Sequence, residues 1–207
     1  IKSSAASDVY KRQTMYGANH EDIAYSYRTG NHGDGSWYSI NGNIDYQRTS
    51  RKNKQRMITF SYKINTQPQT SNSNTGYEDI HAKEEVDDLV KRLLLKNSQS
   101  DGKTNTMEQT FQVDYTTPIG ELHTVEAGAK YIFRRNTSDN KLYEAAGGSD
   151  DYLYNEDRSS DYRHLNHILA AYLGYTLKYK DFTFKPGVRY EQTVQRVKYC
   201  LLYTSDA

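Results

Sequence analysis

Six histidines are the residues of this chain most able to bind a metal ion, since imidazole nitrogen is a common metal ligand. His20, His32, His81 and His123 are scattered, and only the pair His164 and His167 lies close together in the sequence. On a β-strand, a spacing of three residues puts the two side chains on opposite faces. This spacing argues against a shared metal ion, and we predict no metal site and no cofactor.

Oxygen ligands for calcium gather in one polar segment: Asp150, Asp151, Asn155, Glu156, Asp157 and Asp161. Their spacing is not that of an EF-hand loop, which favours a solvated loop over a calcium site. The sequence also contains no nucleophile-elbow, metalloprotease or phosphate-loop pattern. We therefore predict that this chain is not an enzyme.

Apolar and polar residues alternate with a period of two in seven segments, which predicts seven β-strands. In the second of them, Tyr38, Ile40 and Ile44 alternate with amides, hydroxyls and a carboxylate. The predicted strands are residues 22–28, 37–48, 56–65, 106–116, 123–135, 164–179 and 182–198. Each has one apolar, aromatic face and one polar face.

The connections between these strands are short and long in turn. Residues 49–55, 117–121 and 180–181 form short turns, whereas residues 29–36, 66–105 and 136–163 form longer polar links. Val86, Leu89, Val90 and Leu93 follow helical spacing, which predicts a short helix in the loop 80–96. Short turns on one side and long loops on the other are typical of a transmembrane β-barrel. We predict an all-β fold: an antiparallel up-and-down meander of about seven strands that forms an open, curved segment of a large barrel.

Composition agrees with a barrel and excludes helical membrane spans. The mean hydropathy is −0.96, and no stretch of about 20 apolar residues exists. A barrel strand needs only one apolar face, so its average hydropathy stays low. The net charge of +1 and the scattered lysines and arginines do not indicate nucleic-acid binding.

The two faces of the strands receive different predicted roles. The polar face is predicted to line the barrel lumen, with Asp45, Lys63, Glu108, Asp114, Glu126, Lys130, Arg134, Arg189 and Glu191. Rings near the strand ends are predicted to form the membrane girdle: Trp37, Tyr46, Tyr62, Tyr115, Tyr131, Tyr175 and Tyr190. A soluble antiparallel sheet would show the same alternation, but this ring-bordered apolar face favours the barrel.

Two hairpins allow the register to be predicted. In the first, Glu108 would lie opposite Lys130. In the second, the turn at residues 180–181 would place Leu177 opposite Phe184 and Leu173 opposite Val188. Pro186 cannot donate a hydrogen bond to a central ladder, so we expect a bulge or a shifted register there.

Both ends of the chain depart from the alternation. Residues 5–13 and 200–207 resemble translated library-adapter sequence. We predict non-native tails at residues 1–13 and 200–207 around a partial barrel at residues 14–199. Cys200 is the only cysteine, so the sequence contains no disulfide framework.

Two stretches, residues 101–143 and 169–193, resemble outer-membrane barrels related to the TonB-dependent receptors of Gram-negative bacteria. The element Gly187-Val188-Arg189-Tyr190-Glu191 is similar to a strand signature of these receptors. The resemblance implies an internal piece of a receptor in the cell outer membrane, in contact with its lipid. It also implies energised uptake of a bulky nutrient of the siderophore, cobalamin or glycan class. A plug domain and a TonB-like energising protein would be the partners of the full-length parent.

Four loop tyrosines are predicted to contact the ligand: Tyr77, Tyr143, Tyr152 and Tyr154. The alternative is a binding or structural module without transport. It would be either another outer-membrane barrel or a secreted antiparallel β-sandwich that displays adhesive loops.

Overall fold

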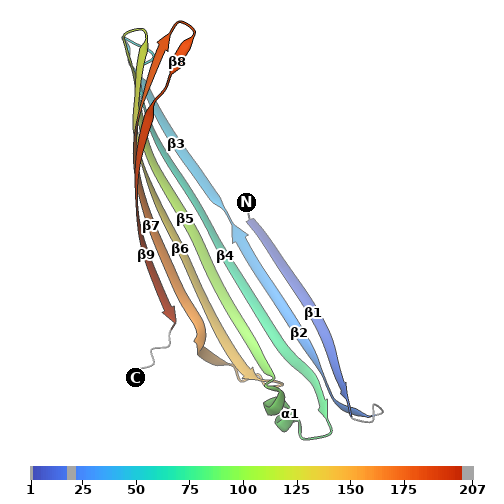
Figure 1. The fold of residues 1–207 in the computed structure, drawn as a ribbon. Coiled ribbons are helices and arrows are strands. Elements are labelled where there is room, and N and C mark those ends of the chain that lie inside the picture. Colours follow the sequence, from blue (N-terminus) through green and yellow to red (C-terminus); the bar gives the residue numbers. More distant parts are fainter. Residues whose placement is uncertain (1, 18–21, 202–207) are drawn as a thin grey trace, which may run out of the picture.

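The computed structural model describes residues 2–17 and 22–201, and these form one antiparallel sheet with one short helix at its end (Figure 1). The sheet is a long single layer that curves along its length. Its elements are β1 (Lys2–Tyr16), β2 (Ile23–Tyr38), β3 (Ile40–Thr49), β4 (Met57–Ala82), α1 (Val86–Leu93), β5 (Lys96–Ile119), β6 (His123–Ala146), β7 (Leu153–Tyr179), β8 (Phe182–Phe184) and β9 (Gly187–Leu201).

The strand order confirms the predicted antiparallel meander. The sheet runs β1-β2-β4-β5-β6-β7-β8, while β3 pairs with β4 and β9 pairs with β7. β2 and β3 lie end to end along β4, just as β8 and β9 lie end to end along β7. The nine strands therefore occupy seven positions in an open sheet. The described residues form a single layer and not the two packed sheets of a β-sandwich.

The link predicted at residues 29–36 is not a loop but part of β2. Gly30 pairs with Tyr10 of β1 on one side and with Gly76 of β4 on the other. Glycine and asparagine are poor strand formers, but strand propensity depends strongly on context. Here ladders on both sides pair the backbone N–H and C=O groups, and this pairing continues the strand through the polar segment.

The long loops predicted at residues 66–105 and 136–163 are mostly strand as well. β4 continues to Ala82 and β5 begins at Lys96, so the connection shrinks to residues 83–95. The second connection shrinks to residues 147–152. Because the side chains of these strand segments are mostly polar, the sequence shows no apolar–polar alternation there. Their backbones nevertheless form the ladder. The three short turns do lie together at the opposite end of the sheet (Figure 1). We call the two ends the loop end and the turn end.

The segment predicted as a non-native tail at residues 1–13 forms most of β1. Its register runs from Lys2 opposite Tyr38 to Tyr16 opposite Ile23, with an irregularity after Met15. β1, not the predicted strand at residues 22–28, is therefore an edge of the sheet. The origin of this segment and of residues 200–207 stays a prediction.

The predicted helix is confirmed as α1, and it covers the small core at the loop end. Leu89 and Val90 of the helix are buried, as is Leu95 just beyond it. Acidic residues in the first turn and basic residues in the last complement the helix dipole. Among the described residues, no helix is long and apolar enough to cross a bilayer.

Candidate functional site

All nine residues predicted to line the lumen lie on one face of the sheet. Directly opposite partners in an antiparallel ladder share a face, so the register carries each face from strand to strand. One row of partners crosses six strands: Asp45, Ser61, Gln112, Lys130, Ala170 and Glu191. Alternation along each strand then adds the remaining members: Lys63, Glu108, Asp114, Glu126, Arg134 and Arg189. We call this the charged face. Its position at a barrel lumen stays a prediction.

Ion pairs cross the charged face. Glu108 lies opposite Arg134, so the predicted partner Lys130 is wrong. The Arg134 Nε donates to Glu108 Oε2 at 2.5 Å. Along β9, Arg189 pairs with Glu191 at 2.6 Å. The charges of this face are thus partly compensated within the sheet.

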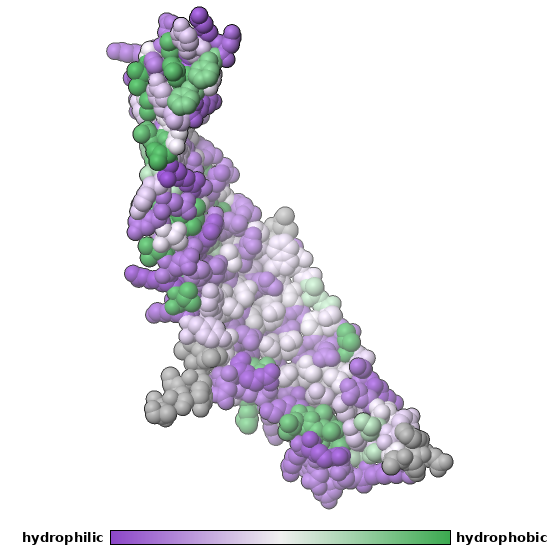
Figure 2. All heavy atoms as spheres, in the orientation of Figure 1, coloured by the Kyte–Doolittle hydropathy of each residue, from purple (hydrophilic) through white to green (hydrophobic). Residues whose placement is uncertain are grey.

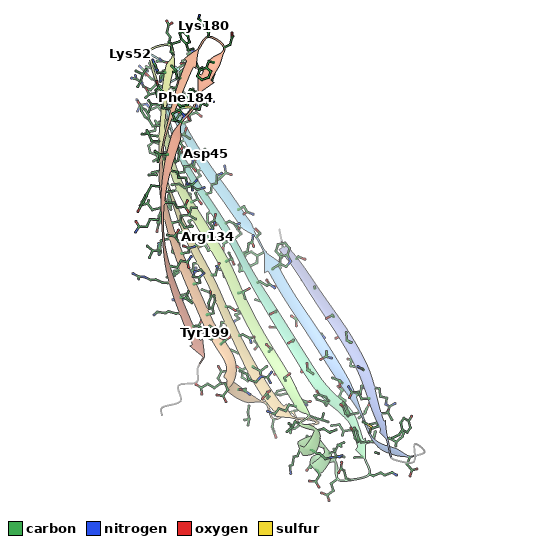
Figure 3. All side chains as sticks on the ribbon, in the orientation of Figure 1. Asp45, Lys52, Arg134, Lys180, Phe184 and Tyr199 are labelled. Carbon is green, nitrogen blue, oxygen red and sulfur yellow. The ribbon has the colours of Figure 1, made fainter. Side chains whose placement is uncertain are left out.

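A hollow of about 520 Å³ lies on the charged face, and Asp45, which Figure 3 labels, is one of its lining residues. Its lining combines carboxylates, ammonium groups and amides: Asp45, Lys63, Asn65, Glu108, Gln112 and Lys130 are among its residues. Such a surface suits water or a polar protein segment better than an apolar ligand.

Tyr172 lies across Gly128, its direct partner in the ladder, on the same face. A Cβ atom on Gly128 would lie 2.3 Å from the Tyr172 hydroxyl and 2.7 Å from Asp114 Oδ1. The tyrosine therefore occupies the space that any side chain at position 128 would need. Glycine permits this close approach.

The opposite, apolar face carries six of the seven predicted girdle residues: Tyr46, Tyr62, Tyr115, Tyr131, Tyr175 and Tyr190. Trp37 does not join them. It pairs with Gln69, which alternation along β4 places on the face of Lys63. Trp37 and Tyr38 are neighbours on one strand, so only one of them can lie on the apolar face. Trp37 therefore lies on the charged face and not with the six tyrosines.

The rings of the apolar face form a row across β4, β5, β6 and β7. The Tyr62 and Phe111 rings are 4.7 Å apart, and the Phe111 and Tyr131 rings are 6.4 Å apart. The row ends at His167, whose Nδ1 lies 2.7 Å from the Tyr131 hydroxyl. Tyrosines with an apolar body and a hydrogen-bonded tip suit the border between lipid and water.

A second histidine contacts a tyrosine hydroxyl near the turn end. His123 Nδ1 lies 2.5 Å from the Tyr175 hydroxyl. Sequence reasoning missed both pairs, because it considered the histidines only as metal ligands. The β6–β7 register would have indicated the Tyr131–His167 contact, because His167 pairs with Phe133 and lies diagonal to Tyr131.

The four tyrosines predicted to contact ligand lie at the loop end as two pairs. The rings of Tyr143 and Tyr154 are 5.4 Å apart. Tyr77 and Tyr152 line a common hollow of about 540 Å³ together with Asn31, Asn97 and Asp150, among other residues. Burial, followed by the nearby Asp150 carboxylate, raises the pKa of the Tyr152 hydroxyl. No contact brings the two pairs into one cluster within the described residues.

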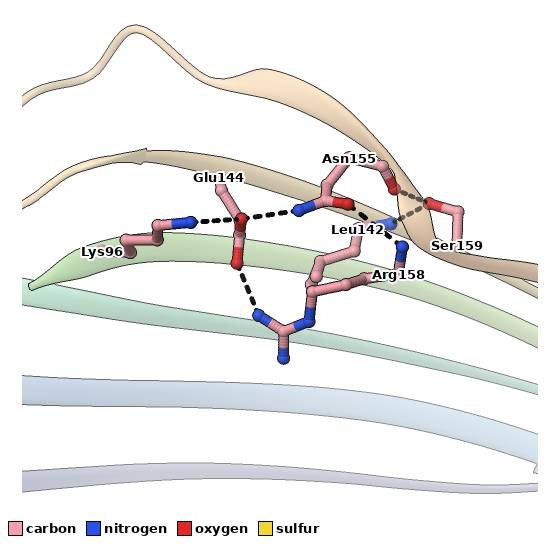
Figure 4. Close-up of polar contacts among 6 residues, drawn as sticks. All are labelled: Lys96, Leu142, Glu144, Asn155, Arg158 and Ser159. Carbon is pink, nitrogen blue, oxygen red and sulfur yellow. Dashed lines mark hydrogen bonds and ion pairs between the residues drawn. The ribbon is translucent and has the colours of Figure 1, made fainter. Parts of the chain in front are cut away.

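A polar cluster centred on Glu144 joins three strands at the loop end (Figure 4). Its carboxylate accepts hydrogen bonds from Lys96 at 3.1 Å, Asn155 at 2.7 Å and Arg158 at 2.5 Å. Burial alone would raise the pKa of Glu144, whose side chain is only 10% exposed. The hydrogen bonds from Asn155, Lys96 and Arg158, together with the positive charge of Lys96, outweigh burial and hold the pKa below its ordinary value.

The same cluster fixes a break in the β6–β7 ladder. Asn140 pairs with Ser160 and Leu142 with Asn155, so the intervening residues of β7 leave the register. The Ser159 hydroxyl, which is buried, donates to the Asn155 carbonyl at 2.6 Å. It also accepts from the Leu142 amide at 3.0 Å. No sequence pattern marks this arrangement, since it depends on which residues the break brings together.

A hollow of about 780 Å³ lies beside this cluster, between α1 and the ends of β5, β6 and β7. Its lining includes Leu94, Leu153, Tyr154 and the carboxylates of Glu156 and Asp157. In the view of Figure 2, hydrophobic residues gather near α1 and again at the turn end.

A single sheet with one apolar, ring-bearing face and one charged face has the surface of a transmembrane β-barrel wall. The comparison with known families gives the same class. The chain belongs to the outer membrane protein beta-barrel family, whose model matches residues 48–205. The protein is therefore located in the outer membrane.

Among solved structures, the chain is similar to the ferric citrate transporter FecA in its unliganded form. The sequence identity is 12% and the TM-score is 0.36. The match covers 98% of this chain and 31% of the FecA chain, so this chain spans about a third of that protein's length. No curated protein sequence matches the chain.

Proposed function

We propose that this chain is part of the wall of a barrel that imports a bulky nutrient across the outer membrane by TonB-type energised uptake. The nutrient would be of the siderophore, cobalamin or glycan class. In the full-length protein, a plug domain would lie against the charged face and a TonB-like protein would supply the energy. The role is transport, with no enzymatic step.

The charged face with its hollow of about 520 Å³ supports this proposal most directly, since it offers a polar surface to a plug domain or to a hydrated ligand path. The paired rings lie at the loop end on the opposite face, which is the face of Tyr131. Tyr154 is 43% exposed and packs against Tyr143. Next to this pair, the Glu144 cluster ties β5, β6 and β7 together and so holds the rings in place. Tyrosine offers an apolar ring and a polar hydroxyl to a ligand at low cost in conformational entropy.

Uptake by cells that make the full-length protein tests the proposal. The probes are a labelled ferric siderophore, cobalamin and an oligosaccharide, each with and without a protonophore. We expect one of the three to accumulate only in energised cells. Failure of all three to accumulate above the level of cells lacking the protein would contradict transport.

Ring variants then test the ligand site. Y143A/Y154A should weaken binding of the transported probe about tenfold, in line with about 0.5–1.5 kcal/mol for each lost ring contact. The control is Y179A, which removes an exposed ring at the turn end. Equal affinity of Y143A/Y154A and Y179A would exclude the loop-end rings as the ligand site.

A non-transporting, adhesive barrel is the second candidate, and exposed leucines at the loop end favour it. Leu94 is 76% exposed and Leu153 is 75% exposed, and both line the same hollow. An adhesive barrel would bind its partner equally well in energised and de-energised cells, and none of the three probes would accumulate.

A further inference from the structure

The connection from β3 to β4 carries a concentration of positive charge that the charged face does not share. Five cationic residues and no carboxylate occur within residues 48–56: Arg48, Arg51, Lys52, Lys54 and Arg56. None of the five forms an ion pair in the part of the chain that the structure describes. Figure 3 shows Lys52 at the turn end, the same end as Lys180.

Hydrogen bonds within the connection hold its backbone in a defined shape. The Ser50 amide donates to the Arg56 carbonyl at 2.9 Å, and the Arg56 amide donates to the Asn53 carbonyl at 3.0 Å. The Asn53 side chain accepts from the Gln55 amide at 2.9 Å. The Arg56 Nε donates to Thr117 Oγ1 on β5 at 3.0 Å. The cationic side chains therefore project from a constrained turn.

Three of these arginines line a hollow of about 510 Å³ that is cationic on one side and apolar on the other. Arg48, Arg51 and Arg56 form the cationic side. Ile58 and Tyr115 form the apolar side, and the ladder places Arg48 opposite Ile58 and Ile58 opposite Tyr115. The hollow thus lies on the apolar face, where that face reaches the turn end.

We propose that this hollow binds one anionic phospholipid of the periplasmic leaflet, with its phosphate between Arg48 and Arg51 and an acyl chain along Ile58 and Tyr115. Short turns of bacterial barrels lie on the periplasmic side, where the leaflet consists of phospholipids. The planar guanidinium fork matches phosphate oxygens in two-point hydrogen bonds. The site does not depend on which nutrient the barrel imports.

The arginines and the apolar residues of the hollow together specify the class of ligand. A cluster of like charges without carboxylates repels itself, and a bound anion relieves that repulsion. A free anion would use the arginines but make no contact with Ile58 and Tyr115. A zwitterionic lipid would use the apolar side but bring its own cation close to the arginines. An anionic phospholipid satisfies both sides.

Titration of the full-length protein in detergent with fluorescently labelled phosphatidylglycerol tests the proposal. R48Q/R51Q should weaken probe binding at least tenfold. The matched control K52Q/K54Q removes the same charge from the same turn, but neither lysine lines the hollow. The control should change binding less than twofold. Unlabelled phosphatidylglycerol should displace the probe, whereas equal concentrations of phosphatidylcholine or inorganic phosphate should not.

Three results would overturn the proposal. Equal weakening in both double variants would mean diffuse attraction by the whole turn. Displacement by phosphatidylcholine would remove the role of the anion, and displacement by inorganic phosphate would remove the role of the acyl chain. Heat-modifiable mobility in gels reports whether R48Q/R51Q folds. If it does not, R51Q alone replaces it, because Arg51 lies outside the ladder, and a loss of at least threefold is expected.

Discussion

Glu144 and Gly128 are the residues whose surroundings constrain them most. Glu144 is a nearly buried carboxylate whose charge is balanced by two cations from different strands. At Gly128, the ring of Tyr172 on the neighbouring strand leaves no space for a side chain. The two residues lie in different parts of the sheet: Glu144 near the loop end of β6 and Gly128 nearer its turn end.

Stability of the loop end should depend on pH through Glu144. Its pKa in the folded protein lies below its ordinary value of 4.5. The stabilisation is therefore complete above pH 4.5 and is lost as the pH falls through the folded-state pKa. We expect hydrogen-exchange protection of the Leu142 amide, corrected for intrinsic rates, to fall in that acidic range.

The variant E144Q should lose about 1–3 kcal/mol of this local protection at pH 7 and show no acidic transition. The control is E156Q, whose carboxylate forms no ion pair in the described part of the chain and which should behave as the wild type. An acidic transition that persists in E144Q would show that another group causes it.

Overpacking should make G128A destabilising by about 1–3 kcal/mol in urea unfolding of the full-length protein. The added methyl group would meet the Tyr172 ring and the Asp114 carboxylate. Gly76 provides the control, because a Cβ atom there would meet no heavy atom within 4 Å. Since the contact is with the far end of the ring, Y172S should recover most of the loss caused by G128A. Equal stability of G128A and G76A would contradict this account.

At the element scale, turn residues decided which registers could be predicted from sequence. The β7–β8 turn consists of only two residues, 180–181, and Lys180 adopts a left-handed conformation (φ 52°). The predicted pairs of Leu177 with Phe184 and Leu173 with Val188 are therefore confirmed. At Pro186 the ladder is interrupted without the predicted bulge or shift, since the register is the same on both sides.

The predicted β5–β6 register was wrong because the turn lies later in the chain than the sequence indicated. The turn was predicted at residues 117–121 because proline favours turns, but Pro118 pairs with Thr124 inside the ladder. The left-handed residue is Gly120 (φ 67°), and the strands are joined by residues 120–122. Glu108 consequently pairs four residues farther along β6 than predicted, with Arg134. A shift by an even number preserved the faces, which explains why the charged face was still identified correctly.

The ladder break in β7 leads to a prediction about tolerated deletions. Removal of residues 156–158 would join Asn155 to Ser159 and make the register continuous with Asn140 opposite Ser160. We expect this variant to fold, as judged by heat-modifiable gel mobility. Deletion of residues 163–165 removes the same number of residues from within the ladder. Because that number is odd, it exchanges the two faces beyond the deletion and should abolish folding. Equal loss of folding in both variants would contradict the assigned register.

For the whole molecule, the strands are far longer than a membrane requires. β5 has 24 residues, which at about 3.4 Å per residue span about 80 Å. The apolar band of an outer-membrane barrel is about 25 Å tall. Alternation identifies the membrane-spanning part, because the two faces meet different solvents there. Beyond the band both faces meet water, so the sequence pattern disappears while the hydrogen-bonded ladder continues. This difference explains why residues 66–82 were predicted as loop.

The two faces should respond oppositely to the same charge. Val113 and Gln112 are neighbours on β5, with Val113 on the apolar face and Gln112 on the charged face. An arginine facing lipid costs about 2–4 kcal/mol at the bilayer midplane of barrels and less toward the interfaces. V113R should therefore lower the free energy of unfolding in phospholipid vesicles by about 1–3 kcal/mol. Q112R places the same side chain between the Asp114 carboxylate and the Lys130 ammonium group, so that attraction and repulsion largely offset, and it should change stability by less than about 0.5 kcal/mol. If the opposite order were measured, with Q112R the more destabilising, the lipid would lie against the charged face, and the lumen would have to be assigned to the row of tyrosine rings.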